Sequence, residues 1–175
     1  MKTNSIFIAI SCFVFLHPGI TKAQSSWNSW TKYPNNPVYF HNTLGAWDVA
    51  SDPAVIKDSS GYIMVVSGDG GINAGSTEGN ALIQATSVDG IAWNTLANGL
   101  NGVVATGYPG DWDESMEMPE IIKLTNQYSL FYCGYDPAVR DSSGGLVWGD
   151  LGLAESTDGI NYIKAGAPVM TRTPN

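Results

Sequence analysis

The feature that most constrains this chain is an internal repeat. Residues 47–69 read WDVASDPAVIKDSSGYIMVVSGD, and residues 112–136 read WDESMEMPEIIKLTNQYSLFYCGYD. The two copies lie 65 to 66 residues apart, and each holds two apolar runs separated by a polar turn. Positions that match between the copies are Trp47/Trp112, Asp48/Asp113, Pro53/Pro119, Lys57/Lys123, Tyr62/Tyr128 and Gly68/Gly134. A repeat of this length indicates that copies of one supersecondary unit stack on each other.

Each copy continues into a second hairpin. Short apolar runs predict four strands in each unit, at 53–57, 62–67, 81–86 and 91–96, and at 119–123, 128–133, 151–155 and 160–164. The turn Ser87-Val88-Asp89-Gly90 recurs as Ser156-Thr157-Asp158-Gly159. In such a turn Asp accepts hydrogen bonds from its own backbone and Gly adopts a positive φ. A recurring four-stranded antiparallel unit is typical of a β-propeller blade.

The predicted fold is therefore all-β, a partial β-propeller with about two four-stranded blades. Residues 47–99 would form the first blade, and residues 100–170 the second. Residues 24–46 would supply an N-terminal closing strand, because their aromatic-lysine-Pro-Val order resembles the end of the second unit. Complete propellers have about four to eight blades, so we expect these residues to form only part of a ring.

The first 23 residues have the pattern of a signal peptide. Lys2 precedes an apolar run at 6–16, and small residues around Ala23 suit a cleavage site. The apolar run is too short to span a membrane. We expect a secreted or periplasmic bacterial protein, and cleavage would leave Cys133 without an intramolecular disulfide partner.

The composition restricts the partners and cofactors. A formal net charge of −8 argues against nucleic acid and anionic membranes as partners. The chain has no spaced His/Cys cluster, so no metal or other cofactor is expected. The loop at Asp69-Gly70-Gly71 and Asp136 could offer oxygen atoms to Ca²⁺, but a hydrated loop is the simpler interpretation.

Three motifs give the chain a resemblance to the five-bladed β-propeller glycoside hydrolases of families 43 and 32. The motifs are Trp47-Asp48 leading to Asp52-Pro53-Ala54-Val55-Ile56, the hairpin Ser87-x-Asp89-Gly90-x-x-Trp93, and Glu117-x-Pro119-Glu120-Ile121 followed by Tyr128-x-Leu130-Phe131-Tyr132. The resemblance covers residues 27–170. It implies a five-bladed ring, a carbohydrate substrate, and acidic residues on the innermost strands around a central funnel.

The resemblance also implies roles for individual residues. Asp52, directly before Pro53, matches the family's catalytic base in the first blade. Glu120, directly after Pro119, matches a second-blade position where the family has Asp. The family's general acid lies two residues before a proline in the third blade; Glu117 has this spacing but lies in the second. We therefore expect Asp52, Glu117 and Glu120 as catalytic candidates, and the 175-residue chain alone to be inactive.

The repeat separates scaffold residues from site residues. Asp48 and Asp113 occur in both units, which favours a structural role in turns. The candidates for substrate binding are Trp47, Trp112, Tyr135 and Asp136, although packing between blades better explains the recurrence of the two tryptophans.

The three catalytic candidates do not recur between the units. Alternation along a strand would place Asp52, the counterpart of Met118, on the same face as Glu120. Glu117 would point the other way unless Pro119 marks a bulge. Two carboxyl groups across a glycosidic bond can serve as acid and base.

Two other functions are compatible with the sequence. A non-catalytic propeller could bind glycans through its aromatic residues, because a fold does not determine a function. A sialidase-like propeller would explain the Ser-x-Asp-Gly-x-x-Trp hairpin. Its box normally has one more residue between Asp and Gly, and Arg140 and Arg172 are too few for the arginine cluster that binds a sialic acid carboxylate.

Overall fold

The computed structural model describes residues 30–39, 50–69, 80–96, 103–147 and 149–172. The chain divides into two compact units, Met1–Pro34 and Asn35–Asn175. The predicted signal peptide and Trp47 lie outside the described residues. Residues 30–39, from the predicted closing strand, contain turns and no strand.

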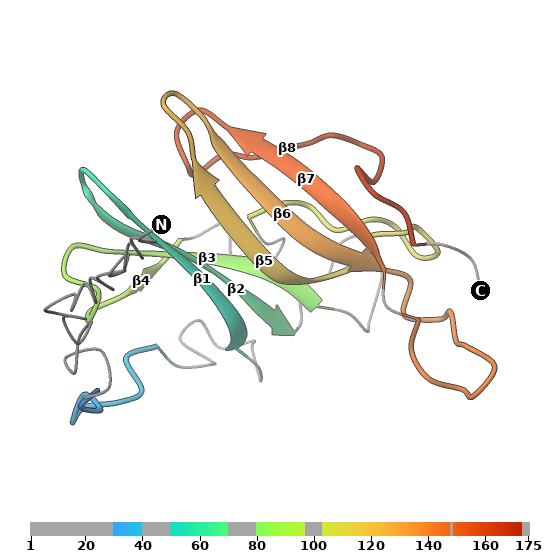
Figure 1. The fold of residues 1–175 in the computed structure, drawn as a ribbon, viewed down its shortest axis with the longest axis horizontal. Coiled ribbons are helices and arrows are strands. Elements are labelled where there is room, and N and C mark those ends of the chain that lie inside the picture. Colours follow the sequence, from blue (N-terminus) through green and yellow to red (C-terminus); the bar gives the residue numbers. More distant parts are fainter. Residues whose placement is uncertain (1–29, 40–49, 70–79, 97–102, 148, 173–175) are drawn as a thin grey trace, which may run out of the picture. The chain divides into compact units, whose positions relative to one another are not determined.

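The second unit contains two four-stranded antiparallel sheets (Figure 1). The strands of blade 1 are β1 (Ala50–Asp58), β2 (Gly61–Asp69), β3 (Asn80–Ser87) and β4 (Asn94–Thr95). Those of blade 2 are β5 (Ser115–Lys123), β6 (Tyr128–Tyr135), β7 (Asp150–Ser156) and β8 (Ile163–Lys164). In both sheets the strands are neighbours in chain order, and no described residue is helical. The prediction of an all-β fold with partial propeller blades is confirmed, and the two sheets do not close into a ring.

The outer strand of each blade is shorter than predicted. β4 and β8 have two residues each, whereas the sequence predicted strands at 91–96 and 160–164. The reason is that the preceding turn continues further. Asp89 Oδ1 accepts hydrogen bonds from the backbone N–H groups of Ile91 and Ala92, at 2.8 and 2.9 Å. These bonds hold the pKa of Asp89 below its usual value, and Asp158 caps the second hairpin in the same way.

The first strand of each blade carries a β-bulge at the same place. The register shifts between Ser51 and Ala54 in β1, and between Glu117 and Glu120 in β5. Within the bulges Asp52 has a φ of 50° and Met118 a φ of 53°, both in the left-handed region. Asp52 and Met118 therefore occupy equivalent positions, as their offset of 66 residues predicts.

The two blades share one hydrophobic core. β5 lies against β1, β2 and β3, so the first strand of blade 2 covers a face of blade 1. The core includes Ala54, Ile63, Val65 and Leu82 from blade 1 and Met116, Ile121, Leu130, Tyr132 and Ala154 from blade 2. One sheet cannot bury both faces alone, so this contact stabilises both blades.

The other face of blade 1 holds a second cluster. Its buried members are Met64, Val66, Ala81, Ile83 and Ala85. Tyr39, from the segment before blade 1, packs against this cluster together with Trp93. The hydroxyl groups of Tyr39 and Thr95 lie 2.9 Å apart and form a hydrogen bond. The segment before blade 1 thus contacts the outer face of its sheet.

Polar contacts also join the blades. The backbone N–H of Met118 donates to Ser67 Oγ at 3.0 Å. Lys123 Nζ lies 2.9 Å from Asp58 Oδ2, an oxygen that also accepts a hydrogen bond from the Tyr128 hydroxyl. Since Ser67 and Asp58 lie near opposite ends of β2 and β1, the blades are linked by hydrogen bonds at two separated points.

A lysine lies over a tyrosine ring in both blades. Lys57 Nζ is 5.4 Å from the ring centre of Tyr62, and Lys123 Nζ is 5.1 Å from that of Tyr128. Both distances suit a cation–π contact. The repeat therefore conserves this contact between its two copies.

Asp113 has the scaffold role that its recurrence predicted. Its side chain is buried, and its Oδ2 lies 2.7 Å from Lys164 Nζ. The Tyr132 hydroxyl donates to the same oxygen at 3.3 Å. Asp113 thereby connects the segment before β5 with β6 and β8.

Candidate functional site

Side chains from three strands meet where β5 begins. Asn80 opens β3 of blade 1, Glu117 lies in β5 directly before the bulge, and Tyr135 ends β6. The Tyr135 hydroxyl donates to Glu117 Oε1 at 2.8 Å. Asn80 Nδ2 donates to the same oxygen and also to the Tyr135 hydroxyl, the latter at 3.3 Å. We call Asn80, Glu117 and Tyr135 the Glu117 cluster.

Two buried serines support this cluster. The backbone N–H of Asn80 donates to Ser115 Oγ at 2.8 Å, so the start of β3 is tied to the start of β5. Ser115 is fully buried, and Ser67, which accepts the Met118 N–H, is 1 % exposed. Small hydroxyl side chains allow the two backbones to approach and still satisfy their N–H groups.

The phenol of Tyr135 is a permanent donor in this environment. Burial is the main cause that raises the pKa of Tyr135 to about 12; the nearby Glu117 carboxylate acts in the same direction, while hydrogen bonds with Ser115 and Asn80 act in the opposite direction. The hydroxyl therefore keeps its proton at physiological pH. Glu117 Oε1 accepts from both this O–H and an amide N–H, an arrangement that suits a carboxylate acting as an acceptor.

Glu117 and Glu120 share a face of blade 2. In the register, Glu117 pairs with Cys133 and Glu120 with Phe131, and these two partners are separated by one residue in β6. Cross-strand partners point to the same side of a sheet. The expectation from uninterrupted alternation, that Glu117 points away from Glu120, is wrong because the bulge inserts one residue between them. Glu120 is exposed, whereas Glu117 is half-buried.

Asp52 lies near the start of β1, close in the chain to the Met118–Ser67 contact between the blades. It is exposed, and Ser51 Oγ donates to its Oδ2 at 3.2 Å. Ser51 pairs with Ser67, the residue that accepts the N–H of Met118. Because Asp52 follows Ser51 and Glu117 precedes Met118, the backbones of both residues adjoin the residues of this contact.

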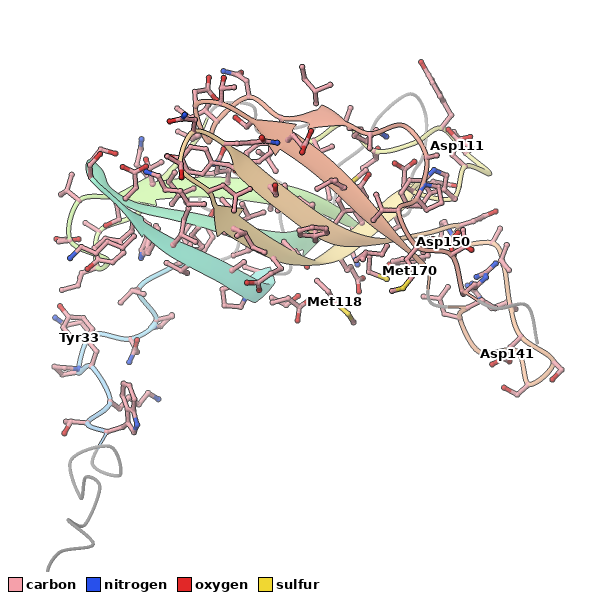
Figure 2. All side chains as sticks on the ribbon, turned by 45° about the horizontal axis from the view of Figure 1, so that its top comes forward. Tyr33, Asp111, Met118, Asp141, Asp150 and Met170 are labelled. Carbon is pink, nitrogen blue, oxygen red and sulfur yellow. The ribbon has the colours of Figure 1, made fainter. Side chains whose placement is uncertain are left out.

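A hollow of about 440 Å³ lies beside a row of cross-strand partners that begins at Glu117. Cys133, the partner of Glu117, pairs with Leu151, which in turn pairs with Met170. The hollow is lined by Cys133, Gly149, Asp150, Leu151, Met170, Thr171 and Arg172. Figure 2 shows Met118 and Met170 projecting toward the same side of the ribbon. This hollow, with both apolar and charged lining residues, therefore lies on the row of cross-strand partners to which Glu117 belongs.

The predicted substrate-binding residues differ in their surroundings. Tyr135 belongs to the Glu117 cluster. Trp112 packs against the core, and its ring stacks on that of Tyr132 with centres 6.0 Å apart. Asp136 Oδ1 accepts the Ala138 N–H at 2.8 Å in the following turn. A contact between these residues and a sugar stays a prediction, and Trp47 lies outside the described residues.

No metal centre is evident in the described ranges: no group of three or more His, Cys, Asp or Glu residues there could hold an ion. The proposed Ca²⁺ ligands in the loop after β2 fall outside the side chains that the structure describes. In the same ranges there is no helix with the length and apolar character needed to cross a membrane.

The arrangement of two blades with bulged first strands defines the class of fold, a segment of a β-propeller. Solved glycoside hydrolase structures share it. A protein assigned as a glycosidase from Bacteroides thetaiotaomicron matches 82 % of this chain and 43 % of its own, with a TM-score of 0.58 and 16 % identity. No protein-family model and no curated protein matches the sequence.

Two further structures match over a smaller share of their length. A protein assigned as a glycoside hydrolase from Parabacteroides distasonis has a TM-score of 0.49 and 18 % identity, covering 69 % of this chain and 32 % of that one. The GH43_1 enzyme from Xanthomonas citri has 0.47 and 13 %, covering 76 % and 34 %. The chain therefore spans less than half of each structure. The likeness to the Bacteroides thetaiotaomicron structure, at 16 % identity and a TM-score of 0.58, confirms the predicted resemblance at the level of the fold.

Proposed function

We propose that this chain supplies two blades of a glycoside hydrolase propeller that acts on glycosidic bonds of oligo- or polysaccharides. The observation that supports the proposal is that Asp52 and Glu117, from different blades, are chain neighbours of residues at the Met118–Ser67 contact. Two carboxylates from different blades thereby come to one end of the sheets. Most glycoside hydrolases cleave the bond with a pair of carboxyl groups that flank it, and Asp52 would be the member of that pair that this chain supplies.

The three carboxylates suit different roles. Asp52 is exposed in the β1 bulge and would activate water as the general base. Glu117 accepts two protein hydrogen bonds and would serve as a fixed acceptor for a sugar hydroxyl. Glu120 is exposed on the same face as Glu117 and would add negative charge near the reacting centre. The resemblance places the proton donor in a third blade, so we propose that the 175-residue chain alone does not hydrolyse its ligand.

A binding titration tests the proposal. The purified chain would be titrated with neutral xylo- and manno-oligosaccharides, and release of reducing ends would be measured in parallel. We expect weak binding without hydrolysis, and binding that weakens in Asp52→Asn and Glu117→Gln. Glu155→Gln is the matched control, since Glu155 is an exposed carboxylate of β7 that accepts a hydrogen bond from Gln127. Absence of binding to every oligosaccharide would refute the function, and hydrolysis would refute the inactivity.

A non-catalytic glycan-binding module is the second candidate. The observation that favours it is the Glu117 cluster, because a carboxylate, an amide and a phenol are common partners of sugar hydroxyl groups. The two functions differ at Asp52. A binding module would lose little affinity in Asp52→Ala if Asp52 only contacts solvent, whereas a hydrolase needs this carboxylate for water activation. The sialidase-like alternative gains no support from Arg140, whose guanidinium donates to the carbonyl groups of Pro137 and Val139.

A further inference from the structure

Asn80 is the member of the Glu117 cluster that no sequence motif explains. It comes from blade 1, whereas Glu117 and Tyr135 come from blade 2. Its backbone N–H donates to the buried Ser115 at 2.8 Å, and its side-chain amide donates to Glu117 and Tyr135. Asn80 therefore contacts three residues of the neighbouring blade.

The three side chains form a closed triangle of hydrogen bonds. A primary amide has two N–H groups, so Asn80 Nδ2 can serve Glu117 Oε1 and the Tyr135 hydroxyl together. The Tyr135 hydroxyl uses its own proton for Glu117 Oε1, at 2.8 Å. A single bond would leave the long Glu117 side chain free to rotate about its own torsions. Two donors on one oxygen, from two blades, restrict that rotation.

We propose that Asn80 is a positioning residue, through which blade 1 fixes the carboxylate that blade 2 presents to a carbohydrate. Fixing a side chain before the ligand arrives lowers the entropic cost of binding. The role toward the ligand rests on the proposed function, but the contact between Asn80 and Glu117 does not. The two parts are therefore tested separately.

The contact is tested without any ligand. The side-chain amide signals of Asn80 would be recorded at neutral pH in the ¹⁵N-labelled 175-residue chain and in its variants. We expect Glu117→Gln to shift these signals, because the amide group donates to Glu117 Oε1. Glu120→Gln should leave them unchanged, because Glu120 is an exposed carboxylate of the same strand. An Asn80 signal that is unaffected by Glu117→Gln would overturn the proposal.

The consequence for binding is tested by titration with the same oligosaccharides. We expect Asn80→Ala to weaken binding about tenfold, the loss typical of a charge-assisted hydrogen bond. Asn161→Ala is the matched control, since Asn161 Nδ2 also donates to a carboxylate, Asp158 Oδ2, at 2.8 Å in the second hairpin. Melting temperatures of both variants would show whether each remains folded.

The outcomes distinguish the positioning role of Asn80 from the proposed function of the chain. Equal affinity of Asn80→Ala and the parent chain would overturn the positioning role while the proposed function stands. If no variant binds any oligosaccharide, the proposed function fails, and the amide signals alone decide whether Asn80 holds Glu117. Equal weakening in Asn80→Ala and Asn161→Ala would show a general loss of stability and would also overturn the positioning role.

Discussion

The backbone N–H of Met118 in one blade donates a hydrogen bond of 3.0 Å to Ser67 Oγ in the other. Ser67 is 1 % exposed, so this contact is shielded from water. It joins the bulge of β5 to β2, the strand next to β1. The hydroxyl of Ser67 therefore links the position of the β5 bulge to the sheet of blade 1.

Loss of this hydroxyl should destabilise the pair of blades. We expect Ser67→Ala to lower the free energy of unfolding by about 1 kcal/mol, because the Met118 N–H loses its acceptor. Urea unfolding would measure the difference. Ser142→Ala, at an exposed serine in the 136–147 segment, is the control and should have almost no effect. Equal stabilities of the two variants would contradict the importance of the contact.

The backbone conformation of Met118 in the β5 bulge leads to a second prediction. Met118 has a φ of 53° and is 53 % exposed, so it combines a disfavoured backbone conformation with little buried side-chain surface. We expect Met118→Val to lower the free energy of unfolding by about 1 kcal/mol, since β-branched residues strongly disfavour positive φ. Met118→Gly should be neutral or stabilising. Met170→Val, at an exposed methionine without positive φ, should change little, and the reverse order would contradict the strained bulge.

Asp58 should make the free energy of unfolding depend on pH in the acidic range. A hydrogen bond from Tyr128, and then one from Lys123, hold the pKa of Asp58 far below its usual range. A lowered folded-state pKa contributes stability above the unfolded-state pKa, about 4, and this contribution is lost as the pH falls toward the folded-state value. The stability difference between the parent chain and Asp58→Asn should therefore be constant above about pH 5 and shrink below about pH 4.

Urea unfolding at a series of pH values would measure that difference. Lys123→Met is the informative companion, because it removes one donor and leaves Tyr128 and the Ser60 N–H in place. We expect it to reduce the acid dependence without abolishing it. A difference that does not vary with pH would show that Asp58 has no such role.

The buried ion pair of blade 2 provides a fourth prediction. Lys164→Met leaves the Asp113 carboxylate, 3 % exposed, with a phenol donor and without its cation. We expect a loss of about 3 kcal/mol, at the lower end for a broken buried pair because Lys164 is partly exposed. Combining the change with Asp113→Asn should recover part of that loss, as a double-mutant cycle would show. Lys32→Met, at an exposed lysine outside the blades, is the control.

The sequence predicted the blades because their repeat follows from packing. Each copy must present similar apolar faces and similar turns, so Asp89 and Asp158 cap equivalent hairpins and Asp52 and Met118 share one backbone conformation. Strand alternation failed at the bulges. A positive φ is usually signalled by glycine, whereas here the residues are Asp and Met, so only the proline that follows each of them hinted at an irregularity.

The site was only partly predictable. Glu117 and Tyr135 lie in the repeated segment, and comparison of the copies singled out Glu117 as specific to one blade. Asn80 had no such signal, because its counterpart at the offset of 69 residues is Gly149 and a loop separates it from the motifs. Its contact with Glu117 spans 37 positions along the chain and exists only once the blades have docked.

The junction between the blades is asymmetric, because an acid from one blade contacts the lysine–tyrosine pair of the other. The acid at the junction, Asp58, comes from the earlier blade and reaches Lys123 and Tyr128 of the later one. Its counterpart in blade 2 is Leu124. An artificial array built by repeating blade 1 would carry an acid at every junction, whereas one built by repeating blade 2 would place leucine there. The two blades are therefore not interchangeable building blocks, and the order in which they are joined decides which junctions contain an ion pair.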